Sequence, residues 1–215
     1  MTEIRIPTYK LSEELLNSIS HGIGAAFGIA ALVTTTVISA MHHNSIGIVS
    51  SVIYGISMIF MFSMSCIYHA LSPKLTAKKV FRVIDHCDIY IYIAGCYTPF
   101  CLSLMGGFNG WLTFAIVWIC AIIGVLLNAI DLEKYEKISL VLYLVMGWMI
   151  VFSIKTLIQK LNPIGFYLLL AGGIAYTIGA ILYGIGAKKP YFHSIFHFFV
   201  LLASILQFCA VLYAI

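Results

Sequence analysis

The sequence predicts an all-α, polytopic membrane protein: a bundle of seven transmembrane helices with its N-terminus in the cytoplasm and its C-terminus outside. Three observations favour this fold. Of the 215 residues, 62% are apolar and only 9% are charged. The mean hydropathy is +1.04, and seven long apolar runs follow one another along the chain. Such a composition is typical of chains that cross a membrane several times.

Each apolar run is long enough for a helix to cross about 30 Å of hydrocarbon at about 1.5 Å per residue. The runs are separated by short polar connections, so we expect one membrane domain over residues 1–215, with a short cytoplasmic N-terminal segment over 1–18. That segment is too acidic for a signal peptide, so the first run is expected to be retained. The predicted spans are 20–40, 46–71, 82–105, 111–130, 138–157, 163–187 and 192–215.

Two local features refine these helices. Pro99 lies inside the third span, where it removes a backbone donor and is expected to kink the helix. Gly24 and Gly28 in the first span are four residues apart, and Ala171, Ala175 and Gly179 repeat this spacing in the sixth. Small residues at this interval allow helices to approach closely.

The orientation follows from the positions of lysine and arginine. Of the twelve basic residues, only Lys155 and Lys160 fall on the side opposite the N-terminus. Cytoplasmic loops of membrane proteins are enriched in basic residues, so the N-terminal side is predicted to be cytoplasmic. The net charge of +4 reflects this asymmetry and gives no reason to expect nucleic acid as a partner. The other ten basic residues are Arg5, Lys10, Lys74, Lys78, Lys79, Arg82, Lys134, Lys137, Lys188 and Lys189.

The six cysteines all lie in apolar spans, and none forms a Cys-x-x-Cys pair. This placement argues against a disulfide framework and against a thiolate zinc site. We therefore expect them to act as small buried hydrophobic residues.

Histidines and aspartates gather at the predicted cytoplasmic ends of four spans. Polar side chains at this depth are costly, so they usually face the bundle interior and either pair or bind something. His42 and His43 are the exceptions, because they fall in the outer loop MHHN and are expected to be solvated. The members of the predicted layer are His21, His69, Asp85, His86, Asp88, His193 and His197.

The spacing within this layer makes it a candidate metal site. His193 and His197 are four residues apart in YFHSIFHFFVLL, so both rings lie on one helix face, and Ser65 and His69 form a second such pair. Neutral imidazole is the commonest protein metal ligand, and three histidines with an open position form a known catalytic zinc arrangement. Asp85 supplies a carboxylate at the same depth. The alternative is that these histidines only hydrogen-bond between helices.

Five stretches carry a resemblance that spans essentially the whole chain: SEELLNSISHGIGAAFGI, SCIYHAL, FRVIDHCDIYIYIAGCYTPF, LVMGW and FHSIFHFFVLLAS. They resemble the hemolysin III family, which belongs with the progestin and adipoQ receptors and more distantly with the alkaline ceramidases. The motifs follow in the family's order: Ser-x-x-x-His ends the second span, Asp begins the third, and His-x-x-x-His begins the seventh.

The resemblance implies a buried Zn²⁺ near the cytoplasmic face, with His69, His193 and His197 as its ligands. It further implies that Asp85 holds or activates a zinc-bound water and that Ser65 supplies a nearby hydroxyl. His21 matches the family's N-terminal histidine, to which no role is assigned. Independently of the resemblance, Asp88 is kept as a second-choice site residue that could pair with a lysine or histidine. The receptors carry a large cytoplasmic domain where this chain has a short segment, which argues against receptor-type signalling.

Three functions stay open at this point. The first is a zinc-dependent lipid hydrolase of the cell membrane, similar to a ceramidase, whose substrate is a membrane lipid with an acyl amide. The second is a pore-forming hemolysin or cytolysin. The third is a sensor or regulator of membrane properties in which zinc is structural. The cell membrane is the expected location, in a bacterium the inner or plasma membrane. The polar residues cluster at one end and leave no continuous polar stripe, which argues against a pore formed by a single chain.

Overall fold

The computed structural model describes residues 3–186 and 189–215, and every regular element in these ranges is helical. The end of the sixth predicted span and the predicted loop residue Lys188 lie outside the described residues. The elements are α1 (Leu11–Met41), α2 (Ser45–Ala70), α3 (Thr76–Thr98), η1 (Pro99–Met105), α4 (Gly107–Trp148), η2 (Met149–Ser153), α5 (Ile154–Lys160), α6 (Pro163–Gly186) and α7 (Phe192–Val211).

Two helices, α1 and α3, begin at least six residues earlier than the sequence predicts. α1 begins at Leu11, so the second half of the segment expected to precede the bundle belongs to its first helix. α3 begins at Thr76 and not at residue 82, so Lys78 and Arg82 lie on a helix, where both are buried. Buried ion pairs satisfy these side chains, and a count of apolar residues cannot detect such pairs.

Six helical stretches within the described residues are long and apolar enough to cross a membrane. The fourth covers 54 residues, Gly107–Lys160, which would extend about 80 Å if it were straight. It includes both the fourth and the fifth predicted spans. Such a length is far more than one hydrocarbon core can accommodate.

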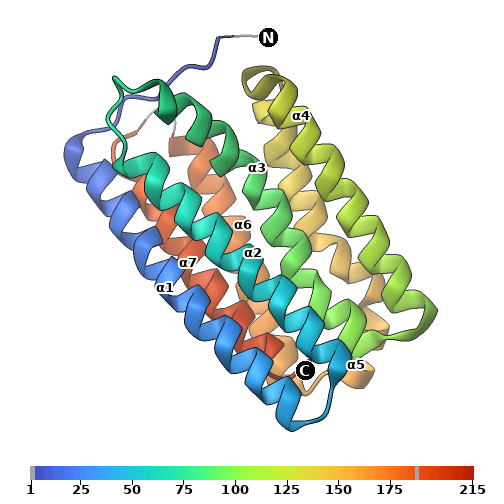
Figure 1. The fold of residues 1–215 in the computed structure, drawn as a ribbon. Coiled ribbons are helices and arrows are strands. Elements are labelled where there is room, and N and C mark those ends of the chain that lie inside the picture. Colours follow the sequence, from blue (N-terminus) through green and yellow to red (C-terminus); the bar gives the residue numbers. More distant parts are fainter. Residues whose placement is uncertain (1–2, 187–188) are drawn as a thin grey trace.

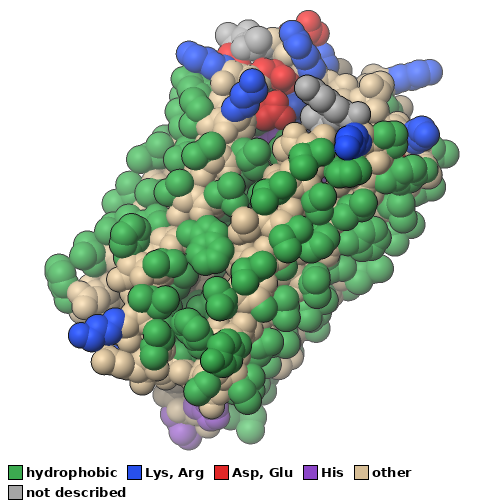
Figure 2. Space-filling view, turned by 180° about the vertical axis from the view of Figure 1, so that it is seen from behind, with side chains coloured by type: hydrophobic (Ala, Val, Ile, Leu, Met, Phe, Trp, Pro, Cys, Tyr) green, Lys and Arg blue, Asp and Glu red, His purple; other side chains and the backbone are tan. Residues whose placement is uncertain are grey.

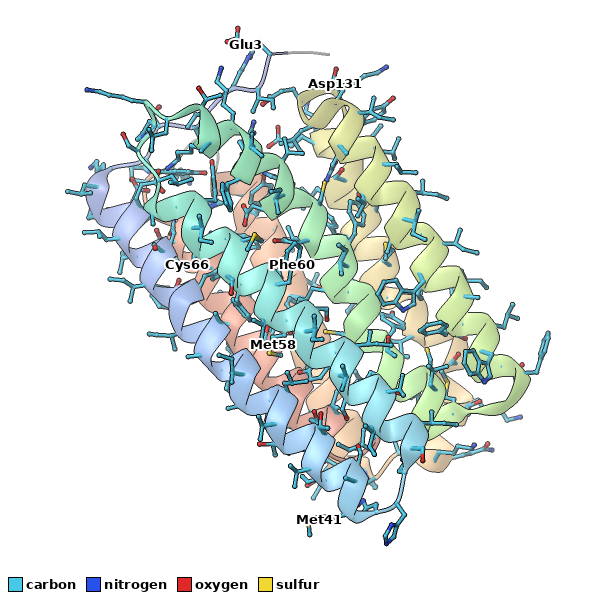
Figure 3. The ribbon with its side chains drawn as sticks, viewed as in Figure 1. Glu3, Met41, Met58, Phe60, Cys66 and Asp131 are labelled. Carbon is cyan, nitrogen blue, oxygen red and sulfur yellow. The ribbon has the colours of Figure 1, made fainter. Side chains whose placement is uncertain are left out.

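Asp131 interrupts this long stretch. Its backbone is not helical (φ −159°, ψ 89°), and its carboxylate accepts a hydrogen bond of 3.2 Å from the backbone N–H of Lys134. The chain turns back at this point, at the same end of the bundle as Glu3 (Figure 3). The loop expected between residues 130 and 138 is therefore reduced to this break, and Lys134 and Lys137 lie on the returning helix.

The helices form one elongated bundle (Figure 1). α1 packs along α2 and α7, α3 lies between α2 and α4, and α6 packs on α7. The N-terminus and the C-terminus lie at opposite ends of the bundle (Figure 1). Large side chains such as Tyr54, Met58 and Phe62 of α2 fill the space between these helices.

Small residues allow the close approach that their spacing predicts. A Cβ atom added at Gly28 would lie 3.0 Å from Cγ1 and 3.2 Å from the backbone nitrogen of Ile59 on α2. At Gly179 on α6, an added Cβ would lie 3.3 Å from Cβ of Phe199 on α7. In the helix pairs α1–α2 and α6–α7, a larger side chain would push the backbones apart.

Pro99 changes the helix type. The α-helical geometry of α3 ends at Thr98, and the seven residues from Pro99 to Met105 form a π-helix. The missing N–H of proline accounts for the break in the regular ladder. Gly106 and Gly107 then turn the chain with positive φ angles of 59° and 55°, which glycine adopts without a steric cost.

Apolar and charged side chains occupy different parts of the outer surface. Hydrophobic side chains cover the flank seen in Figure 2, whereas acidic side chains and most basic ones gather at one end. At that end Arg82 binds Glu133, and Lys79 pairs with Glu3 at 3.3 Å. An apolar flank with a charged end is what a bundle surrounded by lipid requires. The protein is therefore a multi-pass membrane protein.

Candidate metal centre

Three of the predicted histidines meet inside the bundle. His69 lies in the last turn of α2, and His193 and His197 lie in the first two turns of α7. One ring nitrogen from each lies within 4.8 Å of the other two, a grouping that could hold a metal ion. The exposed fraction is 2% for His69, 9% for His193 and 2% for His197.

Two of the separations between these nitrogens suit a tetrahedral metal, and all three nitrogens lie within 4.8 Å of one another. Nε2 of His193 lies 3.4 Å from Nε2 of His69 and 3.0 Å from Nε2 of His197. Zinc–nitrogen bonds are about 2.0–2.1 Å long, so two ligands at a tetrahedral angle are about 3.3 Å apart. Three imidazoles of this kind fit a zinc ion. Nδ1, the other ring nitrogen of His69, contacts Glu14.

Local structure explains why these side chains converge. Ser65 and His69 are one turn apart on the buried face of α2, as their spacing predicts. On α7, His193 and His197 continue into a buried stripe that includes Val200 and Ser204. α1 packs against both helices, so the two buried faces meet although His69 and His193 are 124 residues apart in the sequence.

The two other predicted site residues lie beside the histidines. Asp85 of α3 interacts with the Ser65 hydroxyl and with His69. Ser65 is buried, with 2% of its surface exposed. A carboxylate and a hydroxyl thus accompany three imidazoles, although they come from separate turns of α2 and α3.

The remaining members of the predicted layer take different positions. The His21 ring packs against that of His197, with centroids 3.9 Å apart, and against Phe62 at 4.9 Å. The His86 ring packs edge-on against Tyr183, with ring centroids 6.3 Å apart, and Tyr183 in turn contacts His193 at 5.8 Å. Asp88 is buried on α3, three residues after Asp85. His42 and His43 are exposed beside Met41, at the opposite end of the bundle (Figure 3).

Sequence reasoning missed a carboxylate that contacts the site. Oε2 of Glu14 lies 2.6 Å from Nδ1 of His69, and Asn17 lies 3.4 Å from the same nitrogen. The signal was available, because Glu14, Asn17 and His21 are spaced to share one helix face. It was hidden by the assignment of residues 1–18 to a segment outside the membrane.

The segment before α1 covers the site from the charged end. The Tyr9 ring stacks on His193, with centroids 4.8 Å apart and an interplanar angle of 22°. Burial and the nearby Glu14 raise the pKa of the Tyr9 hydroxyl, so it stays neutral at physiological pH. The Tyr9 ring therefore covers one face of the His193 imidazole.

Glu13 joins the start of α7 to α1. The residue before α7, Tyr191, has a left-handed backbone (φ 64°), and its N–H donates to Oε1 of Glu13 at 2.6 Å. The other carboxylate oxygen of Glu13 accepts from the N–H of Lys10 at 3.0 Å. This contact holds the first turn of α7, and with it His193, against α1.

Comparison with known proteins places the chain in a family. The family model described as "Haemolysin-III related" matches residues 9–208. The chain is 40% identical to "Hemolysin-3" of Bacillus cereus over 207 residues, which cover 96% of this chain and 93% of that protein. It is 38% identical to the "Hemolysin-3 homolog" of Bacillus subtilis (strain 168) over 205 residues, 95% of each.

A more distant relationship extends to animals. The chain is 28% identical to the human "Monocyte to macrophage differentiation factor" over 168 residues, which cover 74% of this chain and 67% of that protein. The family match covers all the helices except the final residues of α7, and it includes the three grouped histidines. This chain belongs to the haemolysin-III-related family of membrane proteins.

Proposed function

We propose that this protein is a zinc-dependent lipid hydrolase of the cell membrane that cleaves an acyl amide. The observation that supports this best is the convergence of His69, His193 and His197 with a carboxylate beside them. Three histidine ligands leave one position of a tetrahedral zinc open for chemistry, whereas structural zinc sites are usually closed by four protein ligands.

In the proposed amide hydrolysis, the zinc ion and the protein side chains would each supply a part of the reaction. Zinc bound at this site would supply Lewis acidity toward a carbonyl oxygen and would acidify a water molecule. Asp85 accepts the proton of the attacking water and returns it to the leaving amine, which is the work of a general base and acid. The Ser65 hydroxyl orients the Asp85 carboxylate. The surrounding apolar bundle suits a substrate that arrives from the lipid phase.

The proposal is tested by supplying the purified protein with lipid amides. Detergent-solubilised protein with one equivalent of zinc is incubated with a panel of ceramides and related acyl amides, and the released fatty acid is measured by mass spectrometry. We expect release that a zinc chelator abolishes and that added zinc restores. If a zinc-loaded protein releases nothing from the panel, the enzymatic proposal fails and structural zinc in a sensor takes its place.

A second candidate function is membrane lysis, because the Bacillus relatives bear the name hemolysin. Lysis can arise from a pore or from a lipid product that disrupts the membrane. The two routes are separated by assaying red-cell lysis with the chelator present. Lysis that continues without zinc favours a pore formed by several copies of the chain, since the polar residues cluster at one end of each bundle.

The membrane topology is part of the proposal. We propose seven crossings, with the two arms of α4 on either side of Asp131 crossing separately, and with the charged end in the cytoplasm. The non-helical backbone at Asp131 and the opposite positions of the termini support this count (Figure 1). The positive-inside rule supports the orientation.

A reporter fusion tests this topology. Alkaline phosphatase fused after residue 215 is expected to be active, because it requires an oxidising compartment outside the cytoplasm. The matched control is a fusion of the same reporter within the charged end, after Asp131, which is expected to be inactive. Activity only in the second fusion would reverse the orientation and place the metal centre near the outer face.

A further inference from the structure

Glu14 lies between a histidine of the metal centre and a buried lysine. Its Oε2 is 2.6 Å from Nδ1 of His69, and its Oε1 is 2.6 Å from Nζ of Lys78. The side chains of His69 and Lys78 have no exposed surface, and that of Glu14 is 12% exposed. One carboxylate from α1 thus joins the end of α2 to the start of α3.

The contact with Glu14 determines which nitrogen of His69 is available. A neutral imidazole carries its proton on one nitrogen and a lone pair on the other. A carboxylate only accepts hydrogen bonds, so Nδ1 of His69 donates to Glu14 and Nε2 holds the lone pair. That lone pair is on the nitrogen that lies 3.4 Å from Nε2 of His193.

Lys78 in turn fixes the position of Glu14. Its ammonium group donates to Glu14 and, at 2.8 Å, to the carbonyl of Leu71, the residue that follows α2. It also lies 5.1 Å from the centre of the Tyr68 ring. Leu71 directly follows α2, whose last turn carries His69. Lys78 therefore holds both the Glu14 carboxylate and the backbone beside His69.

We propose that Glu14 and Lys78 are positioning residues of the metal centre, which fix the tautomer and direction of His69 and thereby strengthen the binding of zinc. Carboxylates that accept from the second nitrogen of a ligating histidine are a recurrent feature of zinc sites, and their loss typically weakens metal affinity by about 10–100-fold. The inference rests on the proposed zinc site and adds to it a role for α1 and α3.

The test is the zinc affinity of Glu14→Gln in the full-length protein, measured by competition with a chromophoric chelator. We expect an affinity about 10–100-fold weaker than that of the wild type. Glu133→Gln is the matched control, because Glu133 also pairs with a buried cation, Arg82, and its side chain is 14% exposed, but its described contacts are with Arg82 and the backbone of Arg5 and with no histidine. Its zinc affinity is expected to equal that of the wild type. Cobalt-substituted protein gives a second readout, since its visible absorption reports a change in ligand geometry.

Lys78→Met tests whether Glu14 and Lys78 position His69 or only hold α1 against α3. Alone, it leaves the largely buried Glu14 carboxylate without its cationic partner, and we expect a lower melting temperature. The double variant Glu14→Gln, Lys78→Met removes both charges, so its melting temperature is expected to recover while its zinc affinity stays as weak as that of Glu14→Gln. It also provides a folded protein if either single variant fails to fold.

The outcomes are distinguishable. A wild-type protein that binds no zinc refutes the metal site itself. A wild type that binds zinc, with Glu14→Gln and the double variant binding equally well, refutes only the positioning role. A double variant that recovers both its melting temperature and its zinc affinity shows that the pair serves to hold α1 against α3.

Discussion

Asp85→Asn is expected to lower lipid-amide hydrolysis by about 10²–10⁴-fold while bound zinc and the melting temperature stay near those of the wild type. Asparagine keeps the size of the side chain and can still interact with the Ser65 hydroxyl, but it cannot accept the proton of an attacking water. General acid–base catalysis typically contributes a factor of this size. The measurement is the turnover of purified, zinc-loaded protein on the best amide of the panel.

Asp88→Asn provides the comparison for this prediction. Asp88 is buried on the same helix three residues further on, so the same change is made in a similar environment. If Asp88→Asn loses turnover and Asp85→Asn retains it, the base is Asp88. If Asp85→Asn retains both hydrolysis and lysis, neither activity depends on a proton transfer at this carboxylate.

The double replacement His193→Ala, His197→Ala is expected to abolish stoichiometric zinc binding. It removes two of the three grouped nitrogens and leaves His69 alone, which cannot hold an ion tightly. Metal content after dialysis should fall from one equivalent to none. A ligand that binds only the native state raises the melting temperature, so added zinc should stabilise the wild type and not the variant.

His42→Ala controls for the loss of a histidine as such. This residue is exposed at the opposite end of the bundle and should leave zinc binding unchanged. A metal that survives the double replacement would have its ligands elsewhere in the chain. The proposed centre would then be wrong, although the family assignment would stand.

The sequence was most informative where one helix face carries the chemistry. The spacing of Ser65 with His69 and of His193 with His197 predicted which side chains share a face, and the polar ends of the spans predicted their common depth. The structure brings the three histidines together as this reasoning expected. The helical architecture followed from the apolar runs, because few other structures can satisfy backbone hydrogen bonds in lipid.

Other features depend on contacts that no local pattern contains. Glu14 and Lys78 looked like ordinary charged residues near a membrane surface, and their mutual pairing helps Lys78 to be buried and Glu14 to be largely so. The break at Asp131 was expected as a loop of several residues, because the lysines after it looked like a connection. In the structure Lys134 and Lys137 continue a helix directly after the break at Asp131.

The position of α7 has a consequence for how the protein is made. His69 and His193 are separated by 124 residues, and α7 leaves the ribosome after α1–α6. A chain that has inserted only α1–α6 holds one of the three grouped histidines, so it cannot yet retain the ion. Metal loading would therefore be a step of maturation that follows membrane insertion. With the proposed zinc site, a bound ion would mark chains in which α7 has docked against α1 and α2.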